Sequence, residues 1–250
     1  MSDATVAAPS QTSIPAAPAK GLVARAVGVI FTPRATYADI AARPRVPGAL
    51  LTVLVIVIGA TGWFLSTSVG QNAYIDQALS SMEGFGRQAN DQQMAGIERM
   101  APYAAYITGV AQLVFVPLVA AIIAGLALAL FNAILGGDAT FKQAFAVVVH
   151  SYFIVALSTL FSMPLFYMRE SMASATSLSV FFPMIDEATF LGRLMGSIDL
   201  FRIWWIVSLS IGFGVLYKRR TATIAWSLLG LYFVIVLIFA GVRTALSGGA

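Results

Sequence analysis

The chain has 250 residues, of which 59% are hydrophobic and only 10% are charged, and its mean hydropathy is +0.85. Because soluble domains carry about 25% charged residues, this composition excludes a soluble enzyme, a nucleic-acid-binding domain and a disordered chain, and it indicates a membrane protein. The chain has no cysteine and one histidine, which excludes disulfides, thiolate metal sites and a cage of several histidines within one chain. No metal, cofactor or nucleic-acid partner is therefore expected.

Residues 1–19 are rich in Ala, Ser, Thr and Pro and show no hydrophobic periodicity, so they are expected to form a disordered cytoplasmic tail. Residues 20–47 are expected to lie along the cytoplasmic membrane surface. From Leu22 to Phe31 the apolar residues recur on one helical face, with Lys20 and Arg25 elsewhere. This pattern predicts an amphipathic helix at the interface.

A second short helix is predicted to begin at Pro33, because proline favours the first helical position, and to end near Arg43, because Pro44 and Pro47 follow. Together the two short helices favour a passive N-terminal anchor. A lipid-sensing or partner-docking role is the alternative, since amphipathic helices that carry Lys and Arg are common beside membranes.

Five long segments with few charges follow, and each is predicted to cross the bilayer. A hydrocarbon core of ~30 Å needs about 20 residues of helix. The predicted spans run from Gly48 to Val69, from Ala104 to Leu135, from Ala144 to Met168, from Leu200 to Tyr217 and from Ile224 to Val242. The fourth is short and crosses only if Arg202 extends its charged end to the membrane surface. The fold class is therefore an all-α, polytopic integral membrane protein with interfacial amphipathic helices, its membrane domain covering residues 48–242.

The charged residues sort unequally into the alternate loops. One side receives nine basic and three acidic residues, and the other receives six basic and eight acidic residues. The positive-inside rule then predicts a cytoplasmic N-terminus and a short extracytoplasmic tail over residues 243–250. Between the last two spans, Lys218, Arg219 and Arg220 are the strongest single determinant of this orientation. They are equally well placed to bind anionic lipid headgroups.

The second predicted span carries small residues at a four-residue spacing. Such residues let helix backbones approach closely, and an internal proline should kink the helix. A helix-packing seam is predicted at Gly109, Pro117, Ala121, Gly125 and Ala129. A moving gate is the alternative, and it is disfavoured because the span lacks polar groups that would line a path.

Three residues are candidate functional polar groups. An ionisable residue inside a span, here His150, is a functional candidate by default, although a structural role is favoured because the neighbouring spans have no carboxylates for a relay. Asp199 and Arg202, at positions i and i+3, are expected to pair on one helix face and fix its depth at the outer interface. An ion gate is the alternative. The chain has no P-loop, zinc-protease or nucleophile-elbow motif, so no catalytic residue is assigned and no enzyme is expected.

Three stretches resemble the Yip1 domain family. They are IFTPRATY at residues 30–37, GGDATFKQA at residues 136–144 and IDLFRIW at residues 198–204. The resemblance covers roughly Leu22 to Val242 and is closer to bacterial members. It implies a five-helix integral membrane protein with a cytoplasmic N-terminus, which agrees with the predicted topology.

Eukaryotic relatives bind Rab-type GTPases and act in vesicle trafficking. The present sequence lacks their Asp-Leu-Tyr-Gly-Pro signature, and its nearest string begins at Asp199 and reads DLFR. Bacterial members have no Rab proteins to bind, so the resemblance does not imply that function here, and it transfers no catalytic residues.

The sequence therefore predicts a non-enzymatic scaffold or adaptor of the bacterial cytoplasmic (inner) membrane. Its expected partners are the lipid bilayer and either another membrane protein or a second copy of the chain. A small-solute or ion transport component is the alternative. A transporter should carry coupled polar groups at the bilayer midplane, whereas this chain places nearly all of its charges near the interfaces.

Overall fold

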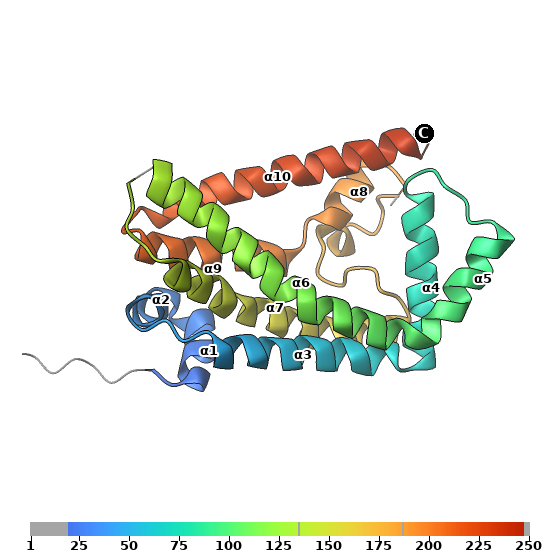
Figure 1. The fold of residues 1–250 in the computed structure, drawn as a ribbon. Helices are drawn as coiled ribbons and strands as arrows, with labels where there is room; N and C mark the ends of the chain where they lie inside the picture. The colour runs from blue at the N-terminus through green and yellow to red at the C-terminus, as the bar shows by residue number, and fades with distance from the viewer. Residues whose placement is uncertain (1–19, 135, 187, 248–250) are drawn as a thin grey trace, which may run out of the picture.

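The computed structural model describes residues 20–134, 136–186 and 188–247, and over these residues it contains helices and no strand (Figure 1). The predicted disordered tail lies outside the described residues. The α-helices are α1 (Leu22–Phe31), α2 (Pro33–Ala42), α3 (Pro47–Leu65), α4 (Ser68–Glu83), α5 (Asp91–Met100), α6 (Ala104–Leu128), α7 (Phe141–Arg169), α8 (Phe190–Ser197), α9 (Leu200–Leu216) and α10 (Thr221–Leu246). Short 3-10 turns at Ala101–Tyr103 and Leu178–Phe181 and a π-helical segment at Ala129–Ile134 complete the described elements.

Four helical segments of the described chain are long and apolar enough to cross a membrane. They are Pro47–Leu65, Asp91–Ala133, Phe141–Arg169 and Thr221–Leu246. Helix α9 has 17 residues and measures roughly 26 Å at 1.5 Å per residue, somewhat less than a ~30 Å hydrocarbon core. The all-α, polytopic fold class is confirmed, and the crossing of α9 stays a prediction.

The first span ends earlier than predicted. Helix α3 stops at Leu65, and the Thr67 hydroxyl caps α4 by accepting a hydrogen bond from the Gly70 N–H at 3.0 Å. A capping residue starts a new helix direction, so Val69 belongs to α4 and not to the span. Gly70 is also needed at this turn, because an added Cβ would clash with the Phe64 carbonyl group.

Helix α7 lies at the centre of the bundle. It packs against α3, α6 and α9 along its length and against α1 and α2 near its start. A helix that is apolar all round is buried by its neighbours, and 61% of the most apolar window of α7 is buried, against 17% for α10. Helix α10 contacts α9 and α8 and lies along one edge of the bundle, on the opposite side from α3 (Figure 1).

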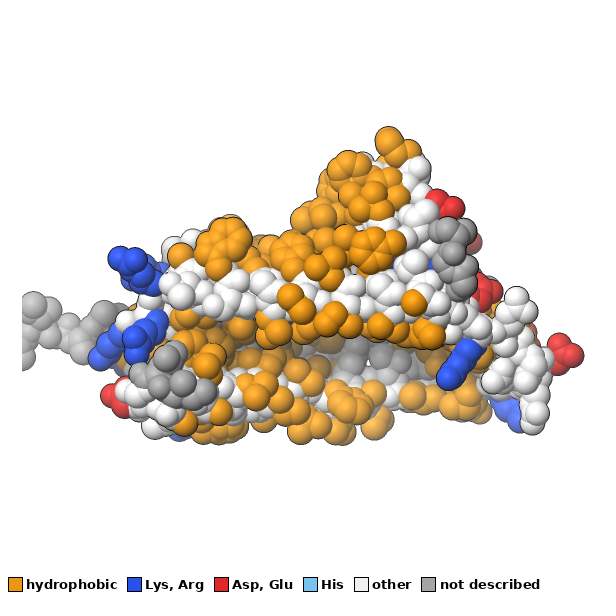
Figure 2. All heavy atoms as spheres, turned by 90° about the horizontal axis from the view of Figure 1, so that it is seen from above, with side chains coloured by type: hydrophobic (Ala, Val, Ile, Leu, Met, Phe, Trp, Pro, Cys, Tyr) orange, Lys and Arg blue, Asp and Glu red, His pale blue; other side chains and the backbone are white. Residues whose placement is uncertain are grey.

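Charged side chains gather at the two ends of the bundle. Figure 2 shows Lys and Arg mainly at one end and Asp and Glu mainly at the other, with hydrophobic side chains covering the length between them. The basic end holds α1, α2 and the turn between α9 and α10, while the other end holds α4, α5 and the C-terminal end of α10 (Figure 1). There the Arg243 guanidinium lies 5.8 Å from the Phe85 ring centre. This arrangement agrees with the predicted sorting of charge to two sides of a membrane.

Candidate functional site

The N-terminal helices α1 and α2 make direct contacts with the long helices of the bundle. The two helices approach closely, because an added Cβ at Gly28 of α1 would clash with the Thr36 hydroxyl of α2. Helix α2 contacts both α7 and α9, and α1 contacts α7. On the outward side of α1, Val23, Val27 and Phe31 are exposed. These three residues lie at i, i+4 and i+8, so they form one apolar row that is available to the membrane surface.

An ion pair with one fully buried partner joins the two N-terminal helices. The Arg25 side chain is only 2% exposed, and its Nε and Nη2 atoms both lie 2.9 Å from Asp39 Oδ2. Its Nη2 atom also donates to the Arg43 carbonyl oxygen at 3.0 Å. Arg25 lies off the apolar face of α1, as predicted, but it forms an internal ion pair instead of facing water. Lys20 donates to the Thr36 hydroxyl at 3.0 Å.

A hydrogen bond holds α2 against α9. The Tyr37 and Ser208 hydroxyl oxygens lie 2.8 Å apart, and both side chains are buried. Burial raises the pKa of the Tyr37 hydroxyl above its ordinary value, and the hydrogen bond with Ser208 opposes this only in part. Tyr37 therefore stays neutral at ordinary pH and links the N-terminal helices to α9. A further contact is made by Gln143 of α7, whose Nε2 donates to the Ala41 carbonyl oxygen at 3.0 Å.

His150 lies in the buried part of α7, where this helix packs against its neighbours. Its side chain is fully buried, and its Nδ1 donates to the Ala146 carbonyl oxygen at 2.7 Å. Its Nε2 has no hydrogen-bond partner within the described part of the chain. The adjacent Ser151 accepts a hydrogen bond from the Trp205 indole N–H at 2.8 Å, which ties α7 to α9. No water-facing surface reaches His150, so its position agrees with the favoured structural role.

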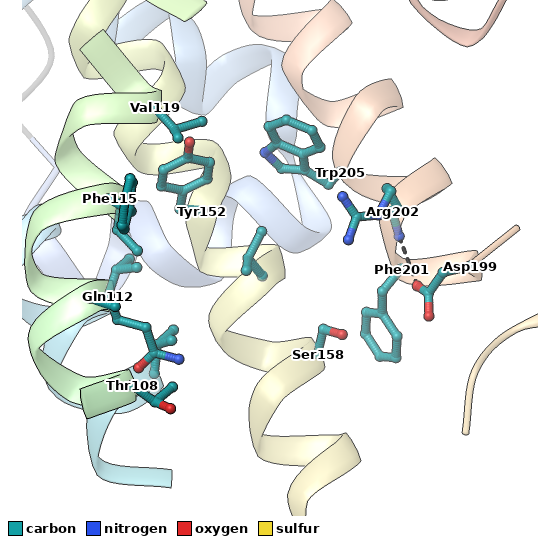
Figure 3. Close-up of a pocket in the computed structure, with 15 residues that line it drawn as sticks. Thr108, Gln112, Phe115, Val119, Tyr152, Ser158, Asp199, Phe201, Arg202 and Trp205 are labelled. Carbon is teal, nitrogen blue, oxygen red and sulfur yellow. Dashed lines mark hydrogen bonds between the residues drawn. The ribbon is translucent and has the colours of Figure 1, made fainter. Parts of the chain in front are cut away.

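Asp199 and Arg202 are near each other in the structure, but their side chains do not pair. The Asp199 carboxylate accepts a hydrogen bond from the Arg202 backbone N–H at 3.1 Å and so caps α9 (Figure 3). It also accepts hydrogen bonds from the hydroxyl groups of Ser174 and Thr176. Among the described residues, no carboxylate lies within 4.0 Å of the Arg202 guanidinium. The expected ion pair is wrong because Asp199 precedes the helix, where its side chain turns to the free N–H groups.

The basic residues after α9 surround a hollow at the end of the bundle. It encloses about 890 Å³ and is lined by Arg34 and Ala38 of α2 together with Lys218, Arg219 and Arg220. Lys218 and Arg220 are exposed, as is Arg34. The chain reaches Arg219 through Lys218, which has a left-handed backbone conformation with φ of 53°. The hollow therefore combines basic side chains from two segments far apart in the sequence.

The packing face of α6 is displaced from the predicted seam. Its buried small residues are Ala104, in a smaller cluster at its start, and Ala120, Ala124 and Ala127, which join the main hydrophobic core. Ala129 is exposed, and Gly109, Pro117, Ala121 and Gly125 are half-buried. Successive helical residues differ by about 100° in direction, so a shift of one residue changes the neighbours. Within the described chain, α6 is more deeply buried at Ala120, Ala124 and Ala127 than along the predicted seam, where a Cβ at Gly109 would still lie 3.4 Å from Ile58 of α3. The seam itself stays a prediction.

Ala124→Leu should therefore destabilise the protein by about 1–3 kcal/mol, because it overpacks a fully buried position. Gly125→Leu is the matched control, since an ideal Cβ at Gly125 meets no described atom within 4 Å. Thermal unfolding of both purified variants in the same detergent measures the difference. An equal or larger loss for Gly125→Leu would contradict this packing face.

Sequence analysis did not single out several residues that form the ion pair and the hydrogen bonds between helices described above. They are Tyr37, Asp39, Ser151, Trp205 and Ser208. Serine hydroxyls inside apolar spans were the available signal, because they hydrogen-bond across helices when they are buried. Within the described part of the chain, no group of three His, Asp or Glu side chains is placed to hold a metal ion.

Comparison with known proteins gives one match. The family model described as Yip1 domain matches residues 27–242. The matched region begins within α1, after Arg25, and ends within α10, so it includes Asp39 and the basic hollow but not Arg25. No curated protein and no solved structure matches the chain.

Proposed function

The chain belongs to the Yip1 domain family, and from this premise we propose that it acts as a non-enzymatic scaffold or adaptor of a bacterial cytoplasmic membrane. In this proposal the basic end of the bundle faces the cytoplasm. Residues 20–47 lie at that membrane surface, and residues 48–242 form a five-span membrane domain. Contact with the lipid bilayer follows from the long apolar helices.

The rigid attachment of α1 and α2 to the spans is the observation that carries this proposal. The pair between Arg25 and Asp39 closes the two helices on each other, and the hydrogen bond between Tyr37 and Ser208 fastens them to α9. If α1 and α2 were attached to the bundle only by a flexible segment, their surface would have to become ordered when a partner binds. Here the exposed side of α2 and the turn after α9 already have a fixed geometry, so less conformational entropy is lost on binding.

The expected partner is a membrane protein with an acidic cytoplasmic segment. Basic side chains from α2 and from the turn after α9 converge on the hollow described above, and opposite charges favour encounter and orientation. A second copy of the chain is less suited to this hollow, since the same end of the bundle is itself mainly basic (Figure 2). For the residues 218–220, anionic lipid headgroups are the competing ligand.

Photocrosslinking in intact membranes tests the scaffold proposal. A photoreactive residue at Ala38, which is exposed in the hollow, should give a discrete protein adduct, and the same residue at Gln88 on the opposite end should not. The charge reversals Arg34→Glu and Lys218→Glu should remove the adduct. Adducts with lipid alone, or protein adducts that survive both reversals, would contradict an acidic protein partner at this surface.

Reconstitution in liposomes addresses the transport alternative. The scaffold proposal expects no solute or ion flux from the purified protein. A flux that His150→Phe abolishes, with the fold intact, would favour a transport component and overturn the scaffold assignment.

A further inference from the structure

A groove between α6 and α9 is separate from the basic end. Helix α7 forms its floor, and α3 contributes its deep end (Figure 3). The groove encloses about 470 Å³, which falls within the range of about 300–1,000 Å³ seen for small-molecule sites. Most of its wall is apolar, with Val53, Val57, Phe115 and Val119 among the lining residues. An apolar group, such as part of an acyl chain, therefore fits this groove better than a hydrated ion does.

The groove is open along the apolar side of the bundle. Phe115 and Val119 are 59% and 42% exposed, and both lie within the long apolar stretch of α6. Exposed apolar residues on a membrane-spanning helix face acyl chains and not water. The molecules with direct access to this groove are therefore the lipids of the bilayer.

The end of the groove near the start of α9 carries a cation. Figure 3 shows the Arg202 guanidinium directed into the groove, and Asp199, which also lines the groove, lies at the start of α9. Asp199 is occupied by two hydroxyl donors and one backbone N–H. Arg202 is exposed and has no carboxylate within 4.0 Å in the described parts of the chain. Its charge is therefore available to an anionic group that enters the groove.

Arg202 supplies a cation of the kind that binds a lipid phosphate. It lies in the first turn of α9 and lines the groove together with Tyr152 and Ser158 of α7. A guanidinium binds phosphate oxygens through two parallel hydrogen bonds. From Arg202 the groove runs inward along α7 towards Val53 and Val119, so a phosphate and an acyl chain can be accommodated together.

We propose that this groove binds one phospholipid, whose phosphodiester pairs with Arg202 and whose acyl chain lies along α7 between α6 and α9. The bound lipid fills the space between α6 and α9, which both pack against α7. This site differs from the lipid-headgroup interpretation of residues 218–220, because it lies at the opposite end of α9 and encloses an acyl chain.

Photolabelling of the full-length protein in bilayers tests the site. The probe is a phosphatidylcholine with a diazirine on one acyl chain, present at trace level, and labelled peptides are located by mass spectrometry. Labelling should concentrate on the α6 segment around Phe115 and exceed that of the exposed α10 face around Val234. Val119→Trp should fill the groove and abolish the excess, whereas Val234→Trp on α10 should leave it intact.

The phosphate contact is tested by its own variants. Arg202→Gln should weaken the specific labelling by about tenfold, the effect of losing one charge-assisted contact. Arg202→Lys should retain part of it, and Arg169→Gln, which removes another exposed arginine at the same end, should retain all of it. A diacylglycerol with the same diazirine but no phosphate should label the groove equally with and without Arg202→Gln.

Three results would overturn the proposal. Equal labelling of α6 and α10, unaffected by Val119→Trp, would show bulk lipid alone. Loss of diacylglycerol labelling in Arg202→Gln would show that Arg202 maintains the groove without binding phosphate. Displacement of the phospholipid by excess inorganic phosphate would show a site for the free anion.

Discussion

Asp39→Asn should lower the free energy of unfolding by about 3 kcal/mol. The substitution leaves the Arg25 guanidinium, which is 2% exposed, without its charged partner. Breaking a buried ion pair by removing one partner costs about 3–5 kcal/mol, and the lower end applies because Asp39 keeps 15% of its side chain exposed. Thermal or denaturant unfolding of the purified protein in one detergent measures the loss.

Arg34→Gln is the matched control for this prediction, because Arg34 lies in the same helix as Asp39 and is exposed. It should change the stability by less than about 0.5 kcal/mol. The double variant Arg25→Met with Asp39→Leu should recover most of the loss, since neither member of the pair then leaves a buried charge behind. Similar stabilities for Asp39→Asn and Arg34→Gln would contradict the role of the pair in holding α1 on α2.

Gly212→Ala should be the most disruptive single methyl addition in the helices from α6 to α10. An ideal Cβ at Gly212 of α9 would lie 2.5 Å from Val147 Cγ1 and 3.1 Å from the Tyr37 ring. Both neighbours are fully buried, so neither can move aside without disturbing the core. The expected loss is about 1–3 kcal/mol, together with a weaker attachment of α2 to α9.

Gly230→Ala in α10 is the matched control, because a Cβ there meets no atom of the described chain within 4 Å. Alanine is the better helix former by about 1 kcal/mol, so this variant should be as stable as the parent or more stable. Unfolding temperatures in one detergent compare the two variants. Gly212→Ala with the stability of Gly230→Ala would mean that α9 does not approach α7 and α2 as closely as described.

The helices were predictable from the sequence because charges and prolines interrupt the apolar runs. The first short helix was predicted from Leu22 to Phe31 and has those bounds, and Pro33 begins the second. These boundaries depend on local signals, which one chain displays directly.

The contacts were less predictable because they depend on how segments meet. Periodicity separated Arg25 from the apolar face of α1, but it could not reveal that Asp39 would cover that side. The four-residue spacing in α6 was present on more than one face, so it could not decide between Ala124 and Gly125. Asp199 was assigned to a helix face, although its non-helical position before α9 directs its carboxylate to the N–H groups and to Thr176.

Thiol accessibility in intact cells tests the membrane topology, on which the cytoplasmic scaffold depends. The chain has no cysteine of its own, so single cysteines can be introduced and probed with an impermeant reagent. Gln88→Cys and Ser247→Cys should be labelled in intact cells, whereas Gly21→Cys and Ala222→Cys should be labelled only after permeabilisation. Labelling of Ala222→Cys in intact cells, with Ser247→Cys protected, would show that α9 does not cross the membrane. Labelling of Gly21→Cys from outside would contradict the cytoplasmic orientation itself.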